Sequence, residues 1–385
     1  MRTKRKIYSY IGSINEMDFN KDVVLVPYYL GKWRQTTCEF YYGKSTSKKE
    51  LPSSYRNISF HCLNEKPESS FFYLKILWSI LKQSKNIDTL LTFHFSNRII
   101  ILTFLLKLLN KNANVWVLGD LNLDMARTLK ENGFVFSKGM MGIIKKRIVH
   151  RFFNILDVFS LETTQYYEMF KPLFEKNNWK CLTYFPCSWD EDNENSLSVL
   201  DDKENIILSC ARFGSYQKNT EMLLEGIEKT DLKDWKIFLV GPISSDFSYG
   251  ENSKFKDYVK DFYSRNPHFV DVVFFTGPVF DTKELFSYFQ RAKVFVMTSR
   301  YEGFANVFAQ ARWNQCFIVS TDVGGAKDMS HDWEFGTPVE QDNSTSLSKV
   351  LQSVIDNGYK MPTREFADLI SYNKTISLIV SQKLQ

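Results

Sequence analysis

Two basic residues and a glycine follow a short apolar run near the middle of the chain. Arg212 comes directly after the run, Gly214 lies in the next loop, and Lys218 stands where a helix is predicted to begin. Two cations and the amides of a helix N-terminus form a set suited to a diphosphate, because each of them attracts negative charge. The alternative is a pair of solvated surface cations, since Arg and Lys are usually exposed.

A second candidate site begins at a single carboxylate, Glu302, between an apolar strand and a helix. Its side chain can accept hydrogen bonds from hydroxyl groups, while the helix amides that follow face an anion. Gln310 lies about two helical turns further on and can reach a second hydroxyl-bearing group. The alternative is a glutamate that only balances the helix dipole.

The double glycine Gly324-Gly325 allows either close approach of the backbone to a ligand or a plain turn.

The elements that must position these residues form a regular series in the second half of the chain. Strands are predicted at 205–210, 235–240, 272–276, 292–298 and 316–321, and helices at 220–229, 253–263, 283–290 and 306–314. Strands separated by helices of this length form parallel β-α-β units. Ligands of open α/β sheets bind at the carboxyl ends of the strands, so Arg212 and Glu302 are expected at one edge of the sheet.

The first half of the chain shows the same alternation less clearly. Strands are predicted at 22–28, 89–93, 114–118 and 157–160, and helices at 69–83 and 97–109. His94 and Asp120 follow two of these strands, where either side chain can orient a reacting group or simply complete hydrogen bonds at a strand end. A polar, acidic stretch at 187–195 interrupts the series and predicts a linker between two domains.

Length and composition exclude several classes of protein. A chain of 385 residues favours two domains, and 44% hydrophobic with 24% charged residues excludes collagen-like, coiled-coil and disordered chains. The formal charge of +5 is a slight basic excess and does not predict a nucleic-acid partner. No G-x-G-x-x-G sequence follows the first strand of either half, which excludes a dinucleotide-dependent oxidoreductase.

The sequence also predicts a compartment. The basic start at 1–6 lacks a following apolar segment, and the longest apolar stretch, 99–109, is shorter than the ~20 residues that span a bilayer. The six cysteines form no C-x-x-C pair, so neither a zinc site nor a disulfide framework is indicated. We therefore expect a cytoplasmic protein with reduced thiols.

The order of these motifs resembles the carboxyl-terminal domain of group 1 glycosyltransferases, also called glycosyltransferase family 4, strongly over residues 205–340 and only by pattern before them. The matching segments are Arg212 with Lys218-Asn219, Val240-Gly241, Phe274 to Gly277, Ser299 to Phe304 and Asp322 to Gly325. The resemblance implies an α/β protein of the GT-B fold, with two Rossmann-like doubly wound domains facing a central cleft. Residues 1–190 would bind the acceptor, 191–362 would bind the nucleotide sugar, and 363–385 would form a helix returning to the first domain.

The resemblance also implies roles for individual residues. Arg212 and Lys218 would hold the donor diphosphate and Glu302 the hydroxyls of the donor sugar, with His94 and Asp120 as further catalytic candidates on the acceptor side. The other predicted donor-binding residues are Gly241, Gly277, Pro278, Val279, Gly303, Phe304, Ala305, Asn306, Val307 and Gln310. Gln310 replaces the second Glu of the family's Glu-x7-Glu pattern, so its contact with the ribose is expected to be weaker.

The implied activity is transfer of a sugar, with retention, from a nucleotide-diphosphate sugar to a glycan or lipid-linked acceptor in bacterial surface polysaccharide or glycoconjugate synthesis. No cofactor or metal is expected, because the D-x-D string at 190–192 falls in the polar linker and predicts a solvated turn. Arg212 and Lys218 would neutralise the leaving diphosphate instead.

Basic residues at 4–6, 107–111 and 145–151 all lie in the first half, which predicts contact between the acceptor domain and the anionic inner face of the cell membrane.

Two alternatives remain for the activity. One is a sugar-nucleotide epimerase of the same fold, which needs acid and base residues that the sequence does not identify. The other is a non-catalytic module that binds nucleotides or glycans, favoured by Gln310.

Overall fold

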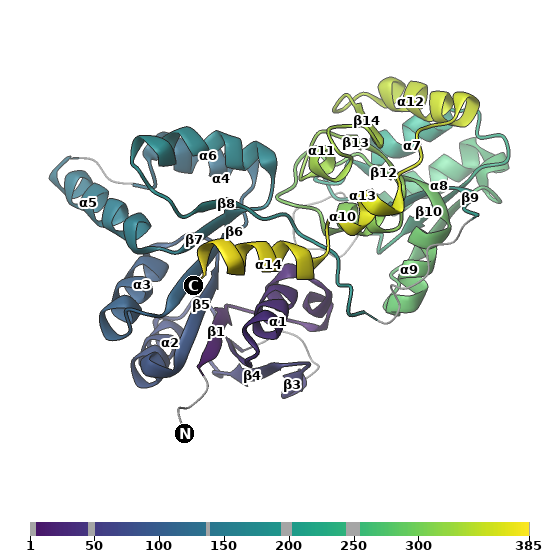
Figure 1. Cartoon of the computed structure of the whole chain (residues 1–385). Helices are drawn as coiled ribbons and strands as arrows, with labels where there is room; N and C mark the ends of the chain where they lie inside the picture. Colours follow the sequence, from purple (N-terminus) through teal and green to yellow (C-terminus); the bar gives the residue numbers. More distant parts are fainter. Residues whose placement is uncertain (1–4, 45–50, 136–138, 194–201, 244–254, 385) are drawn as a thin grey trace. The chain divides into compact units, whose positions relative to one another are not determined.

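The computed structural model of the chain describes residues 5–44, 51–135, 139–193, 202–243 and 255–384 (Figure 1). The chain forms two compact units. Unit 1 contains residues 1–190 and 371–385, and unit 2 contains residues 191–370. Each unit is an α/β structure around a sheet whose strands are almost all parallel.

Unit 1 has an eight-stranded sheet in the order β3-β4-β2-β1-β5-β6-β7-β8, in which only the β3-β4 pair is antiparallel. The strands are β1 (Lys6–Ile11), β2 (Cys38–Tyr42), β3 (Ser54–Tyr55), β4 (Ile58–Cys62), β5 (Ile87–Phe93), β6 (Asn114–Gly119), β7 (Val158–Leu161) and β8 (Leu182–Tyr184). Successive residues of a strand face opposite sides of the sheet, and each side is covered by its own apolar core. Leu90 belongs to one core and Leu91 to the other.

Helices cover both faces of this sheet. They are α1 (Asp22–Arg34), α2 (Ser70–Gln83), α3 (Asn97–Leu109), α4 (Leu123–Asn132), α5 (Gly139–Ile155), α6 (Thr164–Lys176) and α14 (Tyr372–Lys383). Helices α2 to α6 contribute to one core, while α1 and α14 pack together over the other. Ser69 and Ser96 start α2 and α3 by accepting the amides of Phe72 and Ile99, which satisfies one free donor at each helix end.

The predicted strand at 22–28 is wrong, because these residues open helix α1. The first strand along the chain is instead β1, which begins at Lys6, the last residue of the basic start. Residues 23–27 are all buried, since α1 lies between the sheet and α14, and a helix buried on every side shows no polar stripe. Gly31 is also buried within α1.

Unit 2 has a six-stranded, wholly parallel sheet in the order β11-β10-β9-β12-β13-β14. The strands are β9 (Glu204–Cys210), β10 (Lys236–Val240), β11 (Val273–Gly277), β12 (Ala292–Met297), β13 (Phe317–Thr321) and β14 (Gly336–Val339). The helices are α7 (Thr220–Glu228), α8 (Phe255–Arg265), α9 (Thr282–Arg291), α10 (Asn306–Trp313), α11 (Ala326–Met329), α12 (Ser344–Asn357) and α13 (Arg364–Asp368). From β9 the chain adds β10 and β11 on one side of the sheet, and from β12 it adds β13 and β14 on the other side. A ligand is expected at such a switch point, in the loops after β9 and β12.

The segment predicted as one returning helix, 363–385, consists of two helices that belong to different units. Helix α13 lies in unit 2, where the guanidinium of Arg312 donates a hydrogen bond to the Phe366 carbonyl (2.8 Å). Helix α14 lies in unit 1 against α1. The change of unit falls between Ile370 and Ser371.

The predicted solvated turn at the D-x-D string is also wrong for its first residue. Asp190 is buried and forms an ion pair with Arg56 at 2.8 Å. Tyr29 donates a further hydrogen bond to Asp190 (2.8 Å). Asp190 therefore joins three distant segments of unit 1, which explains an acid at this place without a metal.

Candidate functional site

Loops after three neighbouring strands of unit 2 are tied together by backbone hydrogen bonds. The amide of Gly241, after β10, donates to the carbonyl of Gly277, at the end of β11 (3.0 Å). The amide of Phe213, after β9, donates to the carbonyl of Pro242 (2.9 Å). Gly241 has φ 141°, and a Cβ on it would lie 2.0 Å from the carbonyl oxygen of Ala211, so only glycine fits there. Gly241 and Gly277, two of the predicted donor-binding residues, thus belong to one rim.

Glu302 and Lys218 form the centre of this edge. The Nζ of Lys218 lies 2.5 Å from Oε1 of Glu302, and both side chains are largely buried, with 13% and 8% exposed. Gln217 donates from Nε2 to the other carboxylate oxygen of Glu302 (3.0 Å). Arg212 in turn donates to Oε1 of Gln217 (3.2 Å). The structure therefore brings Arg212, Lys218 and Glu302 into one network, with Gln217 as the link.

Gln217 and Arg300 are residues that the sequence analysis missed. The sequence analysis gave Arg300 no role. In the structure its guanidinium donates a hydrogen bond to the Tyr216 carbonyl (2.7 Å) and forms an ion pair with Asp342 (2.8 Å). Its backbone amide donates to the Gln217 carbonyl (2.8 Å). Arg300 therefore fastens the loop that contains Gln217 and Lys218 to the loop that contains Glu302. Gln217 is adjacent to Lys218, and Arg300 lies inside the matching segment Ser299 to Phe304; these positions are the signal that could have indicated them.

The double glycine packs against the site itself. A Cβ on Gly324 would lie 2.3 Å from the Cβ of Glu302, and one on Gly325 would lie 2.5 Å from the ring of Phe304. Both glycines have positive φ. They are needed where β13 meets the 302–305 loop, whose Ala305 amide donates to the Gly324 carbonyl (3.1 Å). Close packing against Glu302 and Phe304, rather than a plain turn alone, accounts for the pair of glycines.

Helix α10 begins at this loop without a side-chain cap. Ala305 occupies the N-cap position and has no hydroxyl or carboxylate to accept the first helix amides. The predicted donor-binding residues Gly303, Phe304, Asn306 and Val307 lie at this helix start and are partly exposed. Such amides can bind an anion.

Two buried polar atoms in this region lack a hydrogen-bond partner within the part of the chain that the structure describes. One is Oε1 of Gln310 on α10, and the other is Oγ of Ser299 after β12. Buried acceptors are normally satisfied, so each is available to a hydroxyl group of a ligand. Pro278 and Val279 follow β11 at the rim, Pro278 exposed and Val279 partly buried.

In unit 1 the two predicted residues His94 and Asp120 lie together at the carboxyl ends of β5 and β6. Nδ1 of His94 is 3.9 Å from a carboxylate oxygen of Asp120 and 3.4 Å from its carbonyl oxygen. Both side chains are about half exposed. A pocket of about 470 Å³ adjoins them; its lining residues are Phe95, Ser96, Asn97, Leu121, Asp124, Met125, Thr128 and Leu129.

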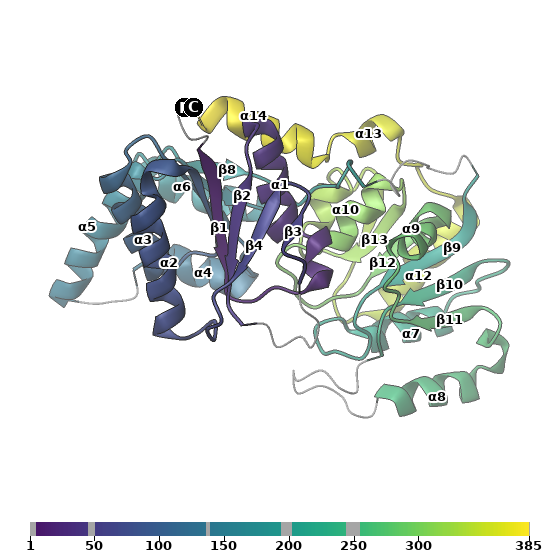
Figure 2. The same cartoon turned by 90° about the horizontal axis from the view of Figure 1, so that it is seen from below.

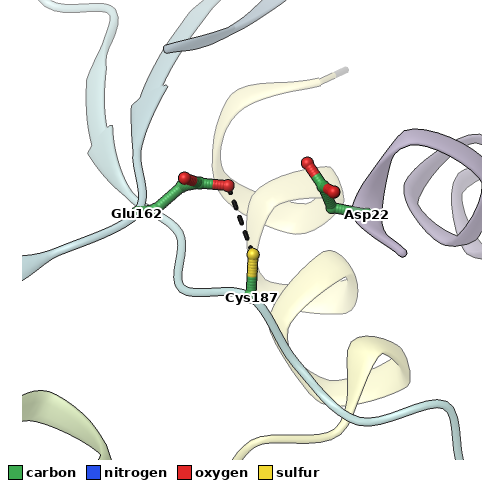
Figure 3. Close-up of side chains that lie close together, drawn as sticks. All are labelled: Asp22, Glu162 and Cys187. Carbon is green, nitrogen blue, oxygen red and sulfur yellow. Dashed lines mark hydrogen bonds between the residues drawn. The ribbon is translucent and has the colours of Figure 1, made fainter. Parts of the chain in front are cut away.

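A cluster of two carboxyls and a thiol lies close to this edge, with Glu162 and Cys187 buried and Asp22 partly buried (Figure 3). Glu162 follows β7, Asp22 begins α1, and the thiol of Cys187 donates to Oε1 of Glu162 at 3.2 Å. One ligand atom from each residue lies within 4.8 Å of the others. Within the described residues this is a group that could hold a metal ion, although carboxyls and thiols in this position also stand without one.

The cluster is electrostatically unusual. Burial raises the pKa of Asp22 to about 6, and repulsion from Asp120 adds to the effect. Burial also raises the pKa of Glu162 well above its ordinary value, with further repulsion from Asp22 and Asp120. Burial and repulsion from neighbouring carboxylates therefore favour the protonated forms of these two carboxyls. The sequence analysis missed the cluster because its members lie far apart in the chain and 22–28 was predicted as a strand.

None of the described helices is long and apolar enough to cross a bilayer.

Comparison with known proteins identifies the second unit. The family model "Glycosyl transferases group 1" matches residues 190–374. A Campylobacter jejuni enzyme, an α-1,4-N-acetyl-D-galactosaminyltransferase that acts on a diphospho-undecaprenol-linked glycan, is 27% identical over 216 residues, 55% of this chain and 53% of the enzyme. The chain thus spans about half the length of this curated relative.

Solved structures share the whole fold. A glycosyltransferase from Rickettsia africae matches 98% of this chain and 97% of its own with a TM-score of 0.67 and 16% identity. An Anabaena protein in complex with UDP-glucose matches 98% of this chain and 95% of its own with a TM-score of 0.57 and 12% identity. Residues 190–374 thus resemble the group 1 glycosyltransferase family, and the two parallel α/β units have the GT-B fold.

Proposed function

We propose that this protein is a glycosyltransferase that moves a sugar from a nucleotide-diphosphate sugar to a lipid-linked glycan, with retention of anomeric configuration, in bacterial surface glycan synthesis. The observation that supports this most is the Arg212, Gln217, Lys218 and Glu302 network at the carboxyl edge of the unit 2 sheet. It combines cations, a carboxylate and the uncapped start of α10 at one place. A sugar diphosphate needs all three kinds of group.

The transition state of sugar transfer has growing negative charge on the leaving phosphate. Arg212, Lys218 and the α10 amides are the groups that would stabilise this charge. In the structure Lys218 and Glu302 neutralise each other. A bound diphosphate would compete for Lys218 and leave Glu302 to accept hydrogen bonds from sugar hydroxyls. Because these cations can neutralise the leaving group, we propose that transfer needs no metal, and a chelator should leave the rate unchanged.

For the nucleoside we propose the rim at Gly241, Gly277, Pro278 and Val279, with Gln310 accepting a ribose hydroxyl through its unpartnered Oε1. For the acceptor we propose the edge of unit 1 at His94 and Asp120 with the adjoining pocket. A lipid-linked acceptor would be met at a membrane surface. The C. jejuni relative acts on such a lipid-linked glycan, which supports the choice of acceptor.

The test compares the protein with its Glu302→Gln and Lys218→Met variants. Nucleotide sugars are first screened by thermal shift, since a donor that binds only the folded protein raises Tm. Both variants should lose at least about 100-fold in transfer, while Glu302→Gln keeps nucleoside diphosphate binding. Transfer by Glu302→Gln at the wild-type rate would contradict the assignment.

The same assay separates the alternatives. An epimerase converts the nucleotide sugar without an acceptor, whereas a transferase consumes it at a useful rate only when an acceptor is supplied. A binding module shows the thermal shift and no turnover of any donor with a panel of lipid-linked glycans. Donor conversion in the absence of acceptor would therefore replace our proposal with the epimerase.

A further inference from the structure

Three neighbouring helices of unit 1 contain no acidic residue. Helices α2, α3 and α5 have eight Lys or Arg residues and neither Asp nor Glu. The basic residues are Lys75, Lys82, Arg98, Lys107, Lys145, Lys146, Arg147 and Arg151. The whole chain has a formal charge of only +5, so these helices hold more than its entire basic excess. Helices α4 and α6, which cover the same core, each contain two acids.

The same three helices expose large apolar side chains. Of the exposed large apolar residues in the described part of the chain, more than half lie on them. They are Phe71, Leu74, Trp78 and Leu81 on α2, Ile101, Leu108 and Leu109 on α3, and Met140, Met141, Ile143, Ile144 and Ile148 on α5. Met140 is 80% exposed, Leu108 77% and Trp78 68%. Leaving so much apolar surface in water is costly, so it indicates an interaction site.

These side chains form one surface, because the helices are neighbours. Helix α2 packs against α3, and α3 packs against α5, and both views show the three side by side (Figures 1 and 2). Each helix turns its buried residues to the core, such as Ile76 on α2 and Phe152 on α5. Phe71, Leu74 and Trp78 recur at the three- and four-residue spacing of one helix face, as do Met140, Ile144 and Ile148. We call this surface the α2-α3-α5 face.

The geometry points to the anionic surface of a lipid bilayer as the partner of the α2-α3-α5 face. Apolar side chains enter the boundary between headgroups and acyl chains, while Lys and Arg beside them contact anionic headgroups. On α5, Arg147 and Arg151 lie one and three residues from Ile148 and four residues from each other, so they share a helix face with the apolar stripe. The inference rests on the proposed function for its biological setting, since a lipid-linked acceptor lies in the same membrane.

Other occupants fit the charge less well. Two copies meeting through this face would bring their cations together with no acid on the helices to pair with them. Nucleic acid would pair with the cations but leave the apolar side chains in water. Lys75 and Lys107 do pair with Glu65 and Asp157, which lie outside the three helices, so the α5 cations are the better ones to test.

The experiment is flotation of the full chain with vesicles. Vesicles of phosphatidylcholine with about 30 mol% phosphatidylglycerol should bind the protein, and pure phosphatidylcholine vesicles should bind it much more weakly. Raising the salt from about 0.1 M to about 1 M shortens the screening length from about 10 Å to about 3 Å and should release it. Absence of binding to the anionic vesicles would overturn the inference.

Two triple variants locate the surface. Lys146→Gln with Arg147→Gln and Arg151→Gln should weaken partition about 100-fold, at about fivefold for each charge removed. Met140→Ser with Ile144→Ser and Ile148→Ser should also weaken it. The matched controls are Lys236→Gln with Lys260→Gln and Lys349→Gln, and Val270→Ser with Leu369→Ser and Leu378→Ser, all at exposed positions in other elements. Equal losses in the controls would show that the face is not the site.

The fluorescence of Trp78 reports contact of the α2-α3-α5 face with acyl chains, which a purely structural effect of a substitution would not produce. Its emission should shift to the blue on anionic vesicles and be quenched by brominated acyl chains, and Trp78→Phe should remove that signal while flotation persists. If the protein forms a concentration-dependent dimer that the α5 variants abolish, and does not bind vesicles, the partner of the face is a second copy of the chain and not a membrane.

The failure of this inference can be told from failure of the proposed function. Vesicle binding requires no sugar transfer, and UDP binding measured by calorimetry checks that each variant keeps unit 2 folded. Transfer with no flotation would contradict the inference alone. Flotation with no transfer from any donor would contradict the proposed function alone.

Discussion

Gly324 lies so close to Glu302 that a Cβ on the glycine would come within 2.3 Å of the Cβ of Glu302. Real Cβ atoms do not approach so closely. The loop after β13 therefore packs directly against the side chain of Glu302 and limits where its carboxylate can lie. Lys218 and Gln217 hold the carboxylate oxygens from the other direction. The orientation of Glu302 is therefore determined by two other segments of unit 2, and each can be tested by substitution.

We expect Gly324→Ala to displace Glu302 and to lower both stability and transfer. Overpacking of this kind costs about 1 to 3 kcal/mol, and a shift of the carboxylate can cost about 100-fold in rate. Urea unfolding and initial rates measure the two effects. Gly358→Ala is the matched control, because Gly358 also has positive φ but no atom within 4 Å of the added Cβ. It should show only the backbone cost of about 1 kcal/mol and a normal rate.

Removal of Lys218 should destabilise the protein more than removal of the whole ion pair. Lys218→Met leaves the buried Glu302 carboxylate without its cation, and breaking a buried pair from one side costs about 3 to 5 kcal/mol. In Lys218→Met with Glu302→Met no charge is left unpaired, so part of that loss should be recovered. A double-mutant cycle on the free energy of unfolding measures the difference. Purely additive losses would show that the pair contributes nothing.

The Asp22, Glu162 and Cys187 cluster predicts a specific pH dependence. The folded pKa of Asp22 is about 6, above its ordinary 3.8, so between these values the folded state binds more protons than the unfolded state. The stabilising contribution is thus complete below about pH 4 and is lost as the pH rises through about 6, with an amplitude of order 1 to 3 kcal/mol. The free energy of unfolding, measured from pH 4 to 8, should fall over this window.

Glu162→Gln should flatten that dependence. It removes the titration of Glu162, whose pKa is raised by burial and by repulsion from Asp22 and Asp120, while the amide oxygen can still accept the Cys187 thiol. The variant should therefore gain stability over the wild type at pH 8 and not at pH 4. Asp257→Asn, at an exposed position on α8, should show no such gain.

Gln310→Glu should tighten donor binding. The unpartnered Oε1 of Gln310 is available to a ribose hydroxyl, and a carboxylate makes hydrogen bonds roughly twice as strong. We expect KM for the preferred nucleotide sugar to fall several-fold with little change in kcat, since ribose is bound equally before and during transfer. Gln352→Glu on α12 is the control. An unchanged KM would remove Gln310 from the proposed nucleoside site.

Much of unit 2 follows from the sequence alone. The strand and helix alternation, and the positions of Arg212, Lys218 and Glu302 at strand ends, depend on local periodicity and on where apolar runs stop. Helix α3 has the bounds 97–109 that its apolar run predicts. Parallel strands bring their carboxyl ends to one edge, so a reader of the sequence can expect these residues to meet.

Other features depend on contacts between segments that no local pattern reveals. Residues 22–28 form a helix because α14, some 350 residues later, covers them, and the apolar run itself fits a strand equally well. Glu162, Asp22 and Cys187 become a cluster only when the order of the strands places β7 and the start of α1 together. The same holds for Gln217 and for Gly324, whose partners lie 85 and 22 residues away.

The sequence by itself therefore determined the family resemblance, the second α/β series and the residue types of the proposed donor site, because these are encoded in short segments. Only the tertiary structure decided that Lys218 and Glu302 neutralise each other, that Asp190 is a buried structural acid, and that the α2-α3-α5 face presents apolar and basic side chains together. The physical reason is that burial and pairing are properties of neighbours in space. A chain position gains them only when the sheet order brings distant segments into contact.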